Sequence, residues 1–467
     1  MFTQNLLPGG NSDRTRSRMR PAQIIPLSFL VAIAAGTLLL LLPFSTAAGE
    51  HTDFLTALFT ATTSVCVTGL VVVDTYAHWS LFGQVIILLL IQLGGLGIIA
   101  VTSALMLLLH KKFSLRNTLL IHDAFNLNSM SDLLGMLKRI LLGTFLVEGA
   151  GAVLYMFTFL PRFGVIRGIW YSVFTAISAF CNAGIDVLGP DSLISWQSSP
   201  AILIPTMLLI IMGGLGYVVW FDVVTCVRSG IRRRFGIRQI YRRLGEHTRL
   251  VLNLTLLLIV SGAVLVFIFE NANPDTIGGM SAGGKVLNSL FQSVTFRTAG
   301  FAAVPQQNLT QASCVLGGLL MFIGGSPVGT AGGVKTVTMA VVILNAVSFI
   351  RARDEVVVQR RRVDSSLIQK AAAIVAVSFS VTFLLLLCLL ATNPVSLTDG
   401  MFEMVSATAT VGLSRALTPM LNTAGRILIV LAMYLGRIGP ISMALFFSGT
   451  WSDKNLVSYA KGNYFVG

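Results

Sequence analysis

Long apolar stretches are the feature that most limits how this chain of 467 residues can fold. A helix needs about 20 mostly apolar residues to cross a bilayer, and eight stretches are long enough to be membrane spans. They cover residues 22–44, 81–109, 137–160, 200–227, 249–271, 313–350, 367–391 and 424–449. Only 11% of the residues are charged, whereas a soluble domain carries about 25%. We therefore expect an all-α membrane protein.

Basic residues predict the orientation of these spans. With a cytoplasmic N-terminus, 25 of the 33 Lys and Arg residues fall in inside segments and 5 in outside segments. Cytoplasmic loops of membrane proteins carry such an excess of positive charge, so both termini are predicted to be cytoplasmic. Residues 1–21 would form an N-terminal arm and 451–467 a C-terminal tail. Topology thereby accounts for the net charge of +14, and we expect no nucleic acid as a partner.

A shorter, moderately apolar stretch lies between the two spans of each successive pair. As a helix of about 20 Å, each is too short to cross the bilayer and long enough to enter it and stop. We predict four tandem helix–pore-loop–helix repeats, with eight transmembrane helices and four re-entrant pore helices, around one central pore. The repeats are assigned to 22–110, 137–227, 249–350 and 367–450. The re-entrant stretches are 53–66, 168–181, 284–296 and 398–410.

Two landmarks recur in step across the four repeats. A Phe precedes a Gly by ten residues in three repeats and by nine in the third, and an apolar residue follows each Gly. A second glycine lies 24 to 29 residues after the first. One such glycine would be weak support, because glycine is common in membrane helices as a packing residue. The pairs are Phe59 and Gly69, Phe174 and Gly184, Phe291 and Gly300, Phe402 and Gly412; the later glycines are Gly94, Gly213, Gly324 and Gly436.

The segments that end in the first glycines are predicted to form an ion filter. Non-helical backbone at membrane depth must line a water-filled cavity or be buried in protein. Four extended chains can present carbonyl oxygens that replace the hydration shell of a potassium ion, and glycine leaves the axis open. These segments contain no Asp or Glu, so an acidic ring for divalent cations is not expected. The predicted filter comprises Val67, Thr68, Gly69, Asn182, Ala183, Gly184, Thr298, Ala299, Gly300, Thr410, Val411 and Gly412, with potassium at the backbone carbonyls.

A glycine-rich stretch interrupts the sixth span. Residues 324–333 contain five glycines and Pro327, which removes a backbone donor and breaks a helix. The freed backbone groups need water or protein partners, so we expect the stretch to lie beside the pore. A plain kink where helices cross is the alternative interpretation.

Two arginines fall in positions where a charge is costly. Arg437 lies about 13 residues into the last span, and a guanidinium at such depth usually has a function. We expect it to pair with carbonyls of 324–333 and to add a positive barrier in the pore; snorkelling to an interface is the alternative. Arg297, three residues before Gly300, could pair with a nearby acid; Glu403 and Asp399 are the candidates, and the sequence does not choose between them.

The filter segments resemble those of the Trk/Ktr/HKT superfamily of potassium transporters, over essentially the whole chain. Without an extra helix pair before the first repeat, the chain is most similar to the Ktr-type membrane subunits. The resemblance implies a preference for potassium, because Gly69 stands where a Ser is associated with sodium permeation in that family. One departure is Cys181, where members often carry Asn. The resemblance rests on residues 67–70, 182–185, 297–301, 410–413 and 436–440 and on the broken sixth span.

The same resemblance implies a gate below the filter. In that family an intramembrane loop and an Arg near it control the pathway. Transferred to this sequence, the gate comprises Gly324, Gly325, Ser326, Pro327, Gly329, Thr330, Gly332, Gly333 and Arg437.

The resemblance also implies partners and a location. Ktr-type subunits form homodimers with one pore per chain, work with a cytosolic nucleotide-binding regulatory ring and lie in the bacterial plasma membrane. This chain has no Walker motif and no GxGxxG unit, so nucleotide control would come from a partner. Two arginine-rich inside loops, at 226–250 and 351–370, are expected to attract anionic lipids and to offer a docking surface for the ring.

Other classes of protein are less consistent with the sequence. It contains no HExxH and no GxSxG motif, so no enzymatic activity and no cofactor are expected apart from potassium in the pore. A sodium- or ammonium-permeable channel of the same architecture is the main alternative. A secondary transporter would show two inverted repeats rather than four in the same direction. Whether transport depends on sodium stays open.

Overall fold

The computed structural model describes residues 21–47, 49, 51–97, 133–353, 355–359 and 361–439. Among these residues the regular structure is helical except for one two-stranded hairpin. Most of the predicted arm 1–21, the end of repeat 1 (98–110), the end of repeat 4 (440–450) and the tail 451–467 lie outside the described residues.

Each repeat begins with a long apolar helix. These helices expose large hydrophobic side chains such as Phe157, Leu256 and Phe379, which suits a surface that faces lipid. Three of them, α7, α12 and α16, are long and apolar enough to cross a membrane, judged on the described residues. The first helices are α1 (Pro21–Leu40), α7 (Leu133–Phe163), α12 (Glu246–Glu270) and α16 (Ser365–Thr392).

A shorter helix follows each first helix and stops inside the molecule. Three of the four begin at a side-chain cap, where Asp53, Ser281 and Ser396 accept backbone N–H groups of the first turn. Their bounds lie within three residues of the predicted stretches. The pore helices are α2 (Phe54–Cys66), α8 (Val165–Cys181), α13 (Ala282–Thr295) and α17 (Leu397–Thr408).

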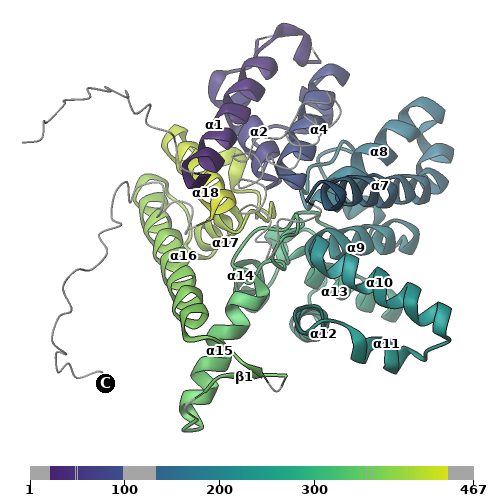
Figure 1. The fold of residues 1–467 in the computed structure, drawn as a ribbon. Coiled ribbons are helices and arrows are strands. Elements are labelled where there is room, and N and C mark those ends of the chain that lie inside the picture. The colour runs from purple at the N-terminus through teal and green to yellow at the C-terminus, as the bar shows by residue number, and fades with distance from the viewer. Residues whose placement is uncertain are drawn as a thin grey trace, which may run out of the picture.

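The second helix of each repeat joins that repeat to the next one. It packs against the pore helix of the following repeat: α4 on α8, α9 on α13, α14 on α17 and finally α18 on α2. These contacts close a ring, and Figure 1 shows the four groups of helices around a centre where the loops meet. The second helices are α4 (Leu81–Leu96), α9 (Pro200–Leu215), α14 (Gln311–Phe322) and α18 (Thr423–Ile438).

Glycines allow three second helices to approach the end of the pore helix in their own repeat. A Cβ added at these positions would lie closer than 3.0 Å to a carbonyl oxygen four residues before the filter glycine. The second landmark of the repeat is therefore a site of backbone contact. The contacts join Gly94 to Val65, Gly213 to Phe180 and Gly436 to Thr408.

The prediction of 200–227 as one straight span is wrong. Helix α9 ends at Leu215, and α10 (Tyr217–Arg233) continues at an angle of 103°. Gly216 between them has a φ of 89°, which glycine adopts without steric cost. The apolar residues that begin α10 fit both a continued span and a helix along the membrane surface, so composition alone did not reveal the bend.

The predicted break in the sixth span is confirmed. Helix α14 ends at Phe322, and α15 (Thr336–Ile350) begins after an irregular segment that contains 324–333. An isolated bridge between Ile323 and Val334 brings the two ends of this segment together.

The remaining elements are short. Short helical turns follow the filter segments: α3 (Thr75–His78) and the 3₁₀ turns Ile194–Trp196, Gln306–Asn308 and Thr418–Met420. Another 3₁₀ turn, Pro43–Ser45, precedes α2.

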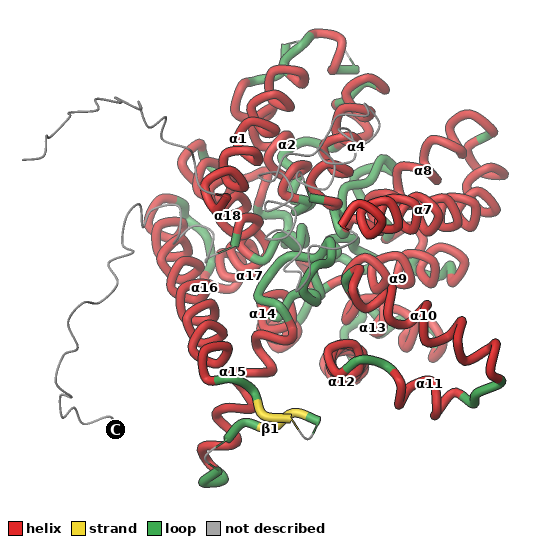
Figure 2. Tube along the Cα trace, viewed as in Figure 1, coloured by secondary structure: helices red, strands yellow, loops and turns green. Residues whose placement is uncertain are grey.

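The arginine-rich segments lie away from the centre. Figure 2 shows α11 (Ile237–Arg243) and the hairpin of β1 (Val357–Val358) and β2 (Arg361–Arg362) at the edge of the molecule, with loops gathered at its centre. In the hairpin, Val357 pairs with Arg362 and Val358 with Arg361. An ion pair between Arg361 and Glu246 ties the hairpin to the start of α12.

Candidate ion-conduction site

Four glycines meet at the centre of the ring. The carbonyl oxygen before each filter glycine lies beside the glycine of the preceding repeat, and a Cβ there would come closer than 3.0 Å to it. The contacts run in order around the ring and close on themselves. They join Gly69 to Ala183, Gly184 to Ala299, Gly300 to Val411 and Gly412 to Thr68.

The backbone around these glycines is left-handed at two positions in every repeat. The glycines have φ values of 100°, 64°, 84° and 97°, and the residues two places earlier also have positive φ. Positive φ is uncommon outside glycine, so its recurrence in four copies marks a specific geometry. A chain that leaves β geometry in this way can turn its carbonyl oxygens toward one axis, as ion coordination requires. The earlier residues are Val67, Asn182, Thr298 and Thr410.

Hydroxyl groups of the pore helices hold the filter segments. The hydroxyls of Thr63 and Ser406 accept hydrogen bonds from the backbone N–H of Gly69 and Gly412, at 2.9 and 3.1 Å. In the other two repeats a hydroxyl donates to the carbonyl after the glycine, from Ser178 to Ile185 and from Thr295 to Phe301.

The sequence analysis missed these hydroxyl residues, although a signal was present. Each lies four residues after the Phe of the first landmark, and each is Ser or Thr. A comparison of the four repeats position by position would have singled out Thr63, Ser178, Thr295 and Ser406 as supports behind the filter.

The pore helices add an electrostatic contribution. Each ends just before a filter segment, so its C-terminal carbonyl groups lie near the ring of glycines. The C-terminal end of a helix carries a partial negative charge. Four such ends around one centre favour a cation there.

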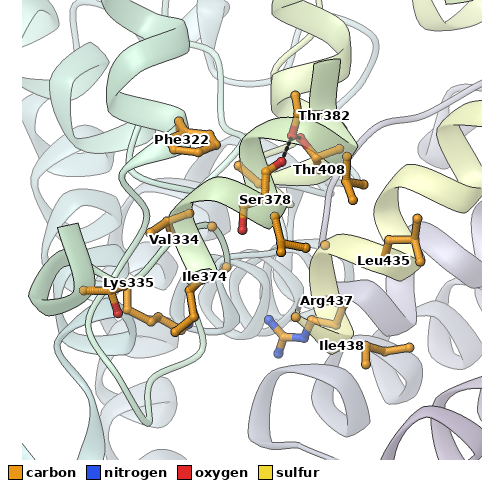
Figure 3. A pocket seen from close by; sticks show the side chains of 18 of the residues that line it. Phe322, Val334, Lys335, Ile374, Ser378, Thr382, Thr408, Leu435, Arg437 and Ile438 are labelled. Atoms are coloured by element: carbon orange, nitrogen blue, oxygen red, sulfur yellow. Dashed lines mark hydrogen bonds between the residues drawn. The ribbon is translucent and has the colours of Figure 1, made fainter. Parts of the chain in front are cut away.

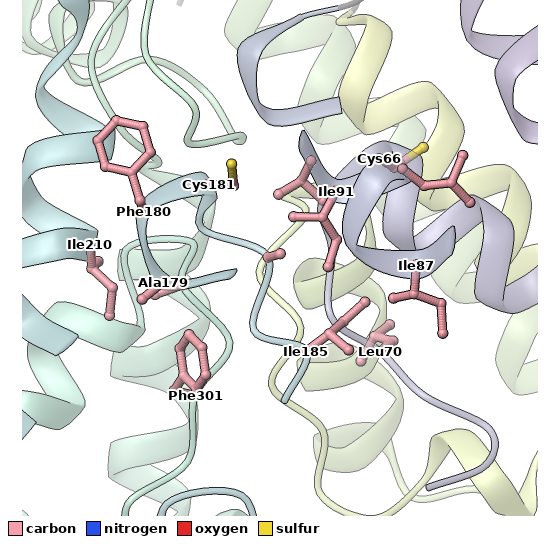
Figure 4. Packing of buried hydrophobic residues seen from close by; sticks show 14 of the residues in the cluster. Cys66, Leu70, Ile87, Ile91, Ala179, Phe180, Cys181, Ile185, Ile210 and Phe301 are labelled. Atoms are coloured by element: carbon pink, nitrogen blue, oxygen red, sulfur yellow. The ribbon is translucent and has the colours of Figure 1, made fainter. Parts of the chain in front are cut away.

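Several polar side chains of the predicted filter are buried. Thr68, Asn182, Thr298 and Thr410 are each at most 1% exposed, and their side chains have no hydrogen-bond partner among the described residues. Apolar side chains of the central cluster lie nearby, and Figure 4 shows Leu70 and Ile185 next to Ile87 of α4.

All twelve predicted filter residues lie in the central loops, because each pore helix ends before its filter segment begins.

The glycine-rich segment 324–333 docks on the end of α9. The N–H groups of Ser326 and Thr330 donate to the carbonyl oxygens of Gly214 and Gly213, at 2.9 and 3.1 Å. The last carbonyls of a helix have no partner within the helix, so the bend at Gly216 makes these acceptors available. The Thr330 hydroxyl also donates to the Phe180 carbonyl at the end of α8.

Arg437 connects the glycine-rich segment to repeat 1. Its guanidinium donates to the carbonyl oxygen of Thr330 at 2.7 Å and to that of Gly94 at 2.5 Å. The expected contact between Arg437 and 324–333 is confirmed.

A cavity of about 810 Å³ lies between the glycine-rich segment and helices α16, α17 and α18. Its walls are mostly apolar, with Lys335 and Arg437 at one end, as Figure 3 shows. Lys335 donates to the carbonyl oxygen of Ala331 at 2.6 Å. Both cations are therefore held by backbone carbonyls rather than by carboxylates.

The expected partners of Arg297 are wrong. Asp399 forms an ion pair with Arg415 at 2.7 Å, and Glu403 accepts hydrogen bonds from Ser414 and Thr418. The Nε atom of Arg297 is buried without a hydrogen-bond partner among the described residues. Arg415, next to the fourth filter segment, therefore occupies Asp399, and two hydroxyl groups occupy Glu403.

The fold and the central site define a membrane protein built from four repeats around a central ring of glycines. A family model described as cation transport protein, TrkH, matches residues 4–459. The chain belongs to the TrkH family of cation transport proteins. The predicted resemblance to the Trk/Ktr/HKT superfamily is confirmed.

Individual relatives agree with this assignment. The chain is 36% identical to the Ktr system potassium uptake protein B of Bacillus subtilis, over 96% of this chain and 97% of that protein. It is 35% identical to the potassium/sodium uptake protein NtpJ of Enterococcus hirae, over 92% and 93% of the two chains.

A solved structure supports the fold. The potassium transporter TrkH from Vibrio parahaemolyticus superposes with a TM-score of 0.72, over 94% of this chain and 87% of that one, at 16% sequence identity. The predicted fold class, four repeats of helix, pore loop and helix, is confirmed, and the chain is a multi-pass membrane protein of a transport family.

Proposed function

We propose that this protein takes up potassium across the plasma membrane through a filter of backbone carbonyls. The observation that carries the proposal is the closed ring in which the carbonyl before each of the four glycines lies beside the glycine of the preceding repeat. Oxygen atoms arranged around an axis can substitute for the water around a potassium ion. Relatives at 36% and 34% identity are named potassium uptake proteins, which supports potassium as the ion.

Gating is assigned to residues 324–333 together with Arg437. The segment lies under the filter, where Thr330 contacts the end of α8 and Arg437 bridges to Gly94 of repeat 1. A guanidinium at this level places a positive charge against a cation in the pathway. The closed state is then the state in which Arg437 holds the segment.

Regulation is assigned to a cytosolic nucleotide-binding ring that docks on the arginine-rich face, with the protein as a homodimer and both termini in the cytoplasm. Arg232 and Arg233 at the end of α10 and Arg234 directly after it are exposed, and two relatives are named as parts of a Ktr system. Anionic lipids are attracted by the same face.

Sodium permeation is a second candidate, because the Enterococcus hirae relative is named a potassium/sodium uptake protein.

The proposed function is tested by potassium uptake in a bacterium that lacks its own potassium transporters, at low external potassium, with and without a cognate ring subunit. Growth that requires the ring and follows potassium rather than sodium supports the proposal. Expression in the membrane without potassium uptake in either case contradicts it.

A further inference from the structure

A carboxyl group is buried near the middle of α7. Glu148 is 4% exposed and lies about midway along the span Leu137–Phe163. An ionisable side chain at this depth is costly and usually has a function. In the part of the chain that the structure describes, no Lys or Arg forms an ion pair with it.

The contacts of Glu148 lead to the end of α4. Both carboxylate oxygens accept from the Nε2 atom of Gln92, at 3.1 Å each. The Cys181 thiol of α8 lies 3.6 Å from the Gln92 Oε1 atom. Helix α7 of repeat 2 thereby holds the Gln92 side chain near the C-terminal end of α4 in repeat 1.

The held turn contains one of the two acceptors of Arg437. Gly94 follows Gln92 by two residues, and its carbonyl oxygen receives the second guanidinium bond. The turn is confined on both sides, because a Cβ at Gly94 or Gly95 would come closer than 3.0 Å to Val65 or Cys181. Gln92 and the Gly94 carbonyl thus belong to one closely packed turn, which Glu148 contacts from one side and Arg437 from the other.

We propose that Glu148 is a positioning residue for the gate: through Gln92 it holds the last turn of α4 so that the Gly94 carbonyl accepts Arg437. This inference rests on the proposed function, in which Arg437 keeps the glycine-rich segment under the filter. Loss of the carboxylate weakens one of the two bonds of Arg437. The segment is then released more often, and the pathway leaks.

The experiment measures potassium flux into vesicles that contain the full chain without a regulatory ring. Glu148→Gln is expected to raise this flux about three- to tenfold, because the charged acceptor of the Gln92 amide is replaced by a neutral one, which makes a weaker hydrogen bond. In the Arg437→Ala background the same substitution is expected to add nothing, because the bond it supports is already absent. A purely structural role would change the amount of folded protein and would add to the effect of Arg437→Ala.

Glu270→Gln is the matched control. Glu270 is also a buried carboxyl in a first helix, 1% exposed, but its partners are Thr276 and Thr310 at the far end of α12. Its effect on flux is expected to be the same in both backgrounds.

Two outcomes overturn the inference: flux of Glu148→Gln equal to wild type at normal abundance, or an increase that adds fully to that of Arg437→Ala. If Glu148→Gln does not fold, Gln92→Met makes the same test, since it keeps the volume of the side chain and removes the contact. Failure of the proposed function is seen separately, as absence of potassium flux in both wild type and Arg437→Ala.

Discussion

Single residues decide the geometry of the filter. At Gly69 the backbone has a φ of 100°, and a side chain would collide with the Ala183 carbonyl of the next repeat. The geometry of one repeat at this point therefore depends on the backbone of its neighbour, and we expect any replacement of this glycine to move an oxygen of the ring.

Gly69→Ser should raise sodium permeability relative to potassium. Strain at such a position costs about 1–3 kcal/mol, which is enough for about a tenfold change in the permeability ratio. The ratio is measured as competing sodium and potassium fluxes in vesicles. Gly283→Ser, at an exposed position with open space around it, is the control and should behave as wild type. An unchanged permeability ratio in Gly69→Ser would contradict the assignment of Gly69 to the filter.

Arg437→Ala should raise potassium flux without the ring by about tenfold, because two hydrogen bonds from a charged group are lost. The control is Arg426→Ala in the same helix, whose guanidinium bonds the carbonyls of Leu421 and Pro419 at the outer end. Equal flux in wild type and Arg437→Ala would argue for a packing role of this arginine.

How far the sequence predicted the site can be judged at this scale. The filter glycines were predicted because they recur in register across the four repeats. Arg437 was predicted because a charged residue is unusual within an apolar span. Glu148 and Gln92 were not, because their helices show no repeat at those positions and only packing brings them together. The pairing of Arg297 with Asp399 was wrongly predicted because Asp399 pairs with Arg415 instead.

At the scale of elements, the glycine-rich segment is held from two directions. Its N–H groups bond the freed end of α9, and its Thr330 carbonyl takes Arg437. The break in the span was predictable from Pro327 and the glycines. The docking site was not, because it requires the bend at Gly216, which the apolar residues on both sides concealed.

Deletion of 326–331 should raise potassium flux, since it removes most of the glycine-rich segment that we propose as the gate. Joining the ends is feasible, because the N–H of Gly325 already donates to the Gly332 carbonyl at 3.3 Å. Replacing the same six residues with a Gly/Ser segment of equal length is the control and should raise flux less. Flux equal to or below wild type at normal abundance would count against the segment as a gate.

At the scale of the whole molecule, helices contact their neighbours in a closed order, and the face predicted to be cytoplasmic carries the arginines. The four repeats and their register were predictable because every repeat must satisfy the same geometry around one axis. The ends of repeats 1 and 4, at 98–110 and 440–450, lie outside the described residues, so those predicted bounds stay predictions.

Replacing Arg232, Arg233 and Arg234 with Gln should lower ring-dependent uptake several-fold and leave flux without the ring unchanged. The expected cause is loss of charge on the docking face. Uptake is compared with and without the ring subunit, and binding of the ring is measured directly. Arg167→Gln, an exposed arginine on the predicted outer side, is the control. Normal binding of the ring by the triple variant would place the docking surface elsewhere.

The closed order of the helices has a practical consequence, because all four walls of the proposed pathway belong to one polypeptide. A substitution enters the pore once, whereas in a pore of four identical subunits it would enter four times. Gly69, Gly184, Gly300 and Gly412 can therefore be replaced singly or in any combination at known stoichiometry. A series of this kind would measure how ion discrimination is divided among the walls, and whether each wall contributes independently of the others.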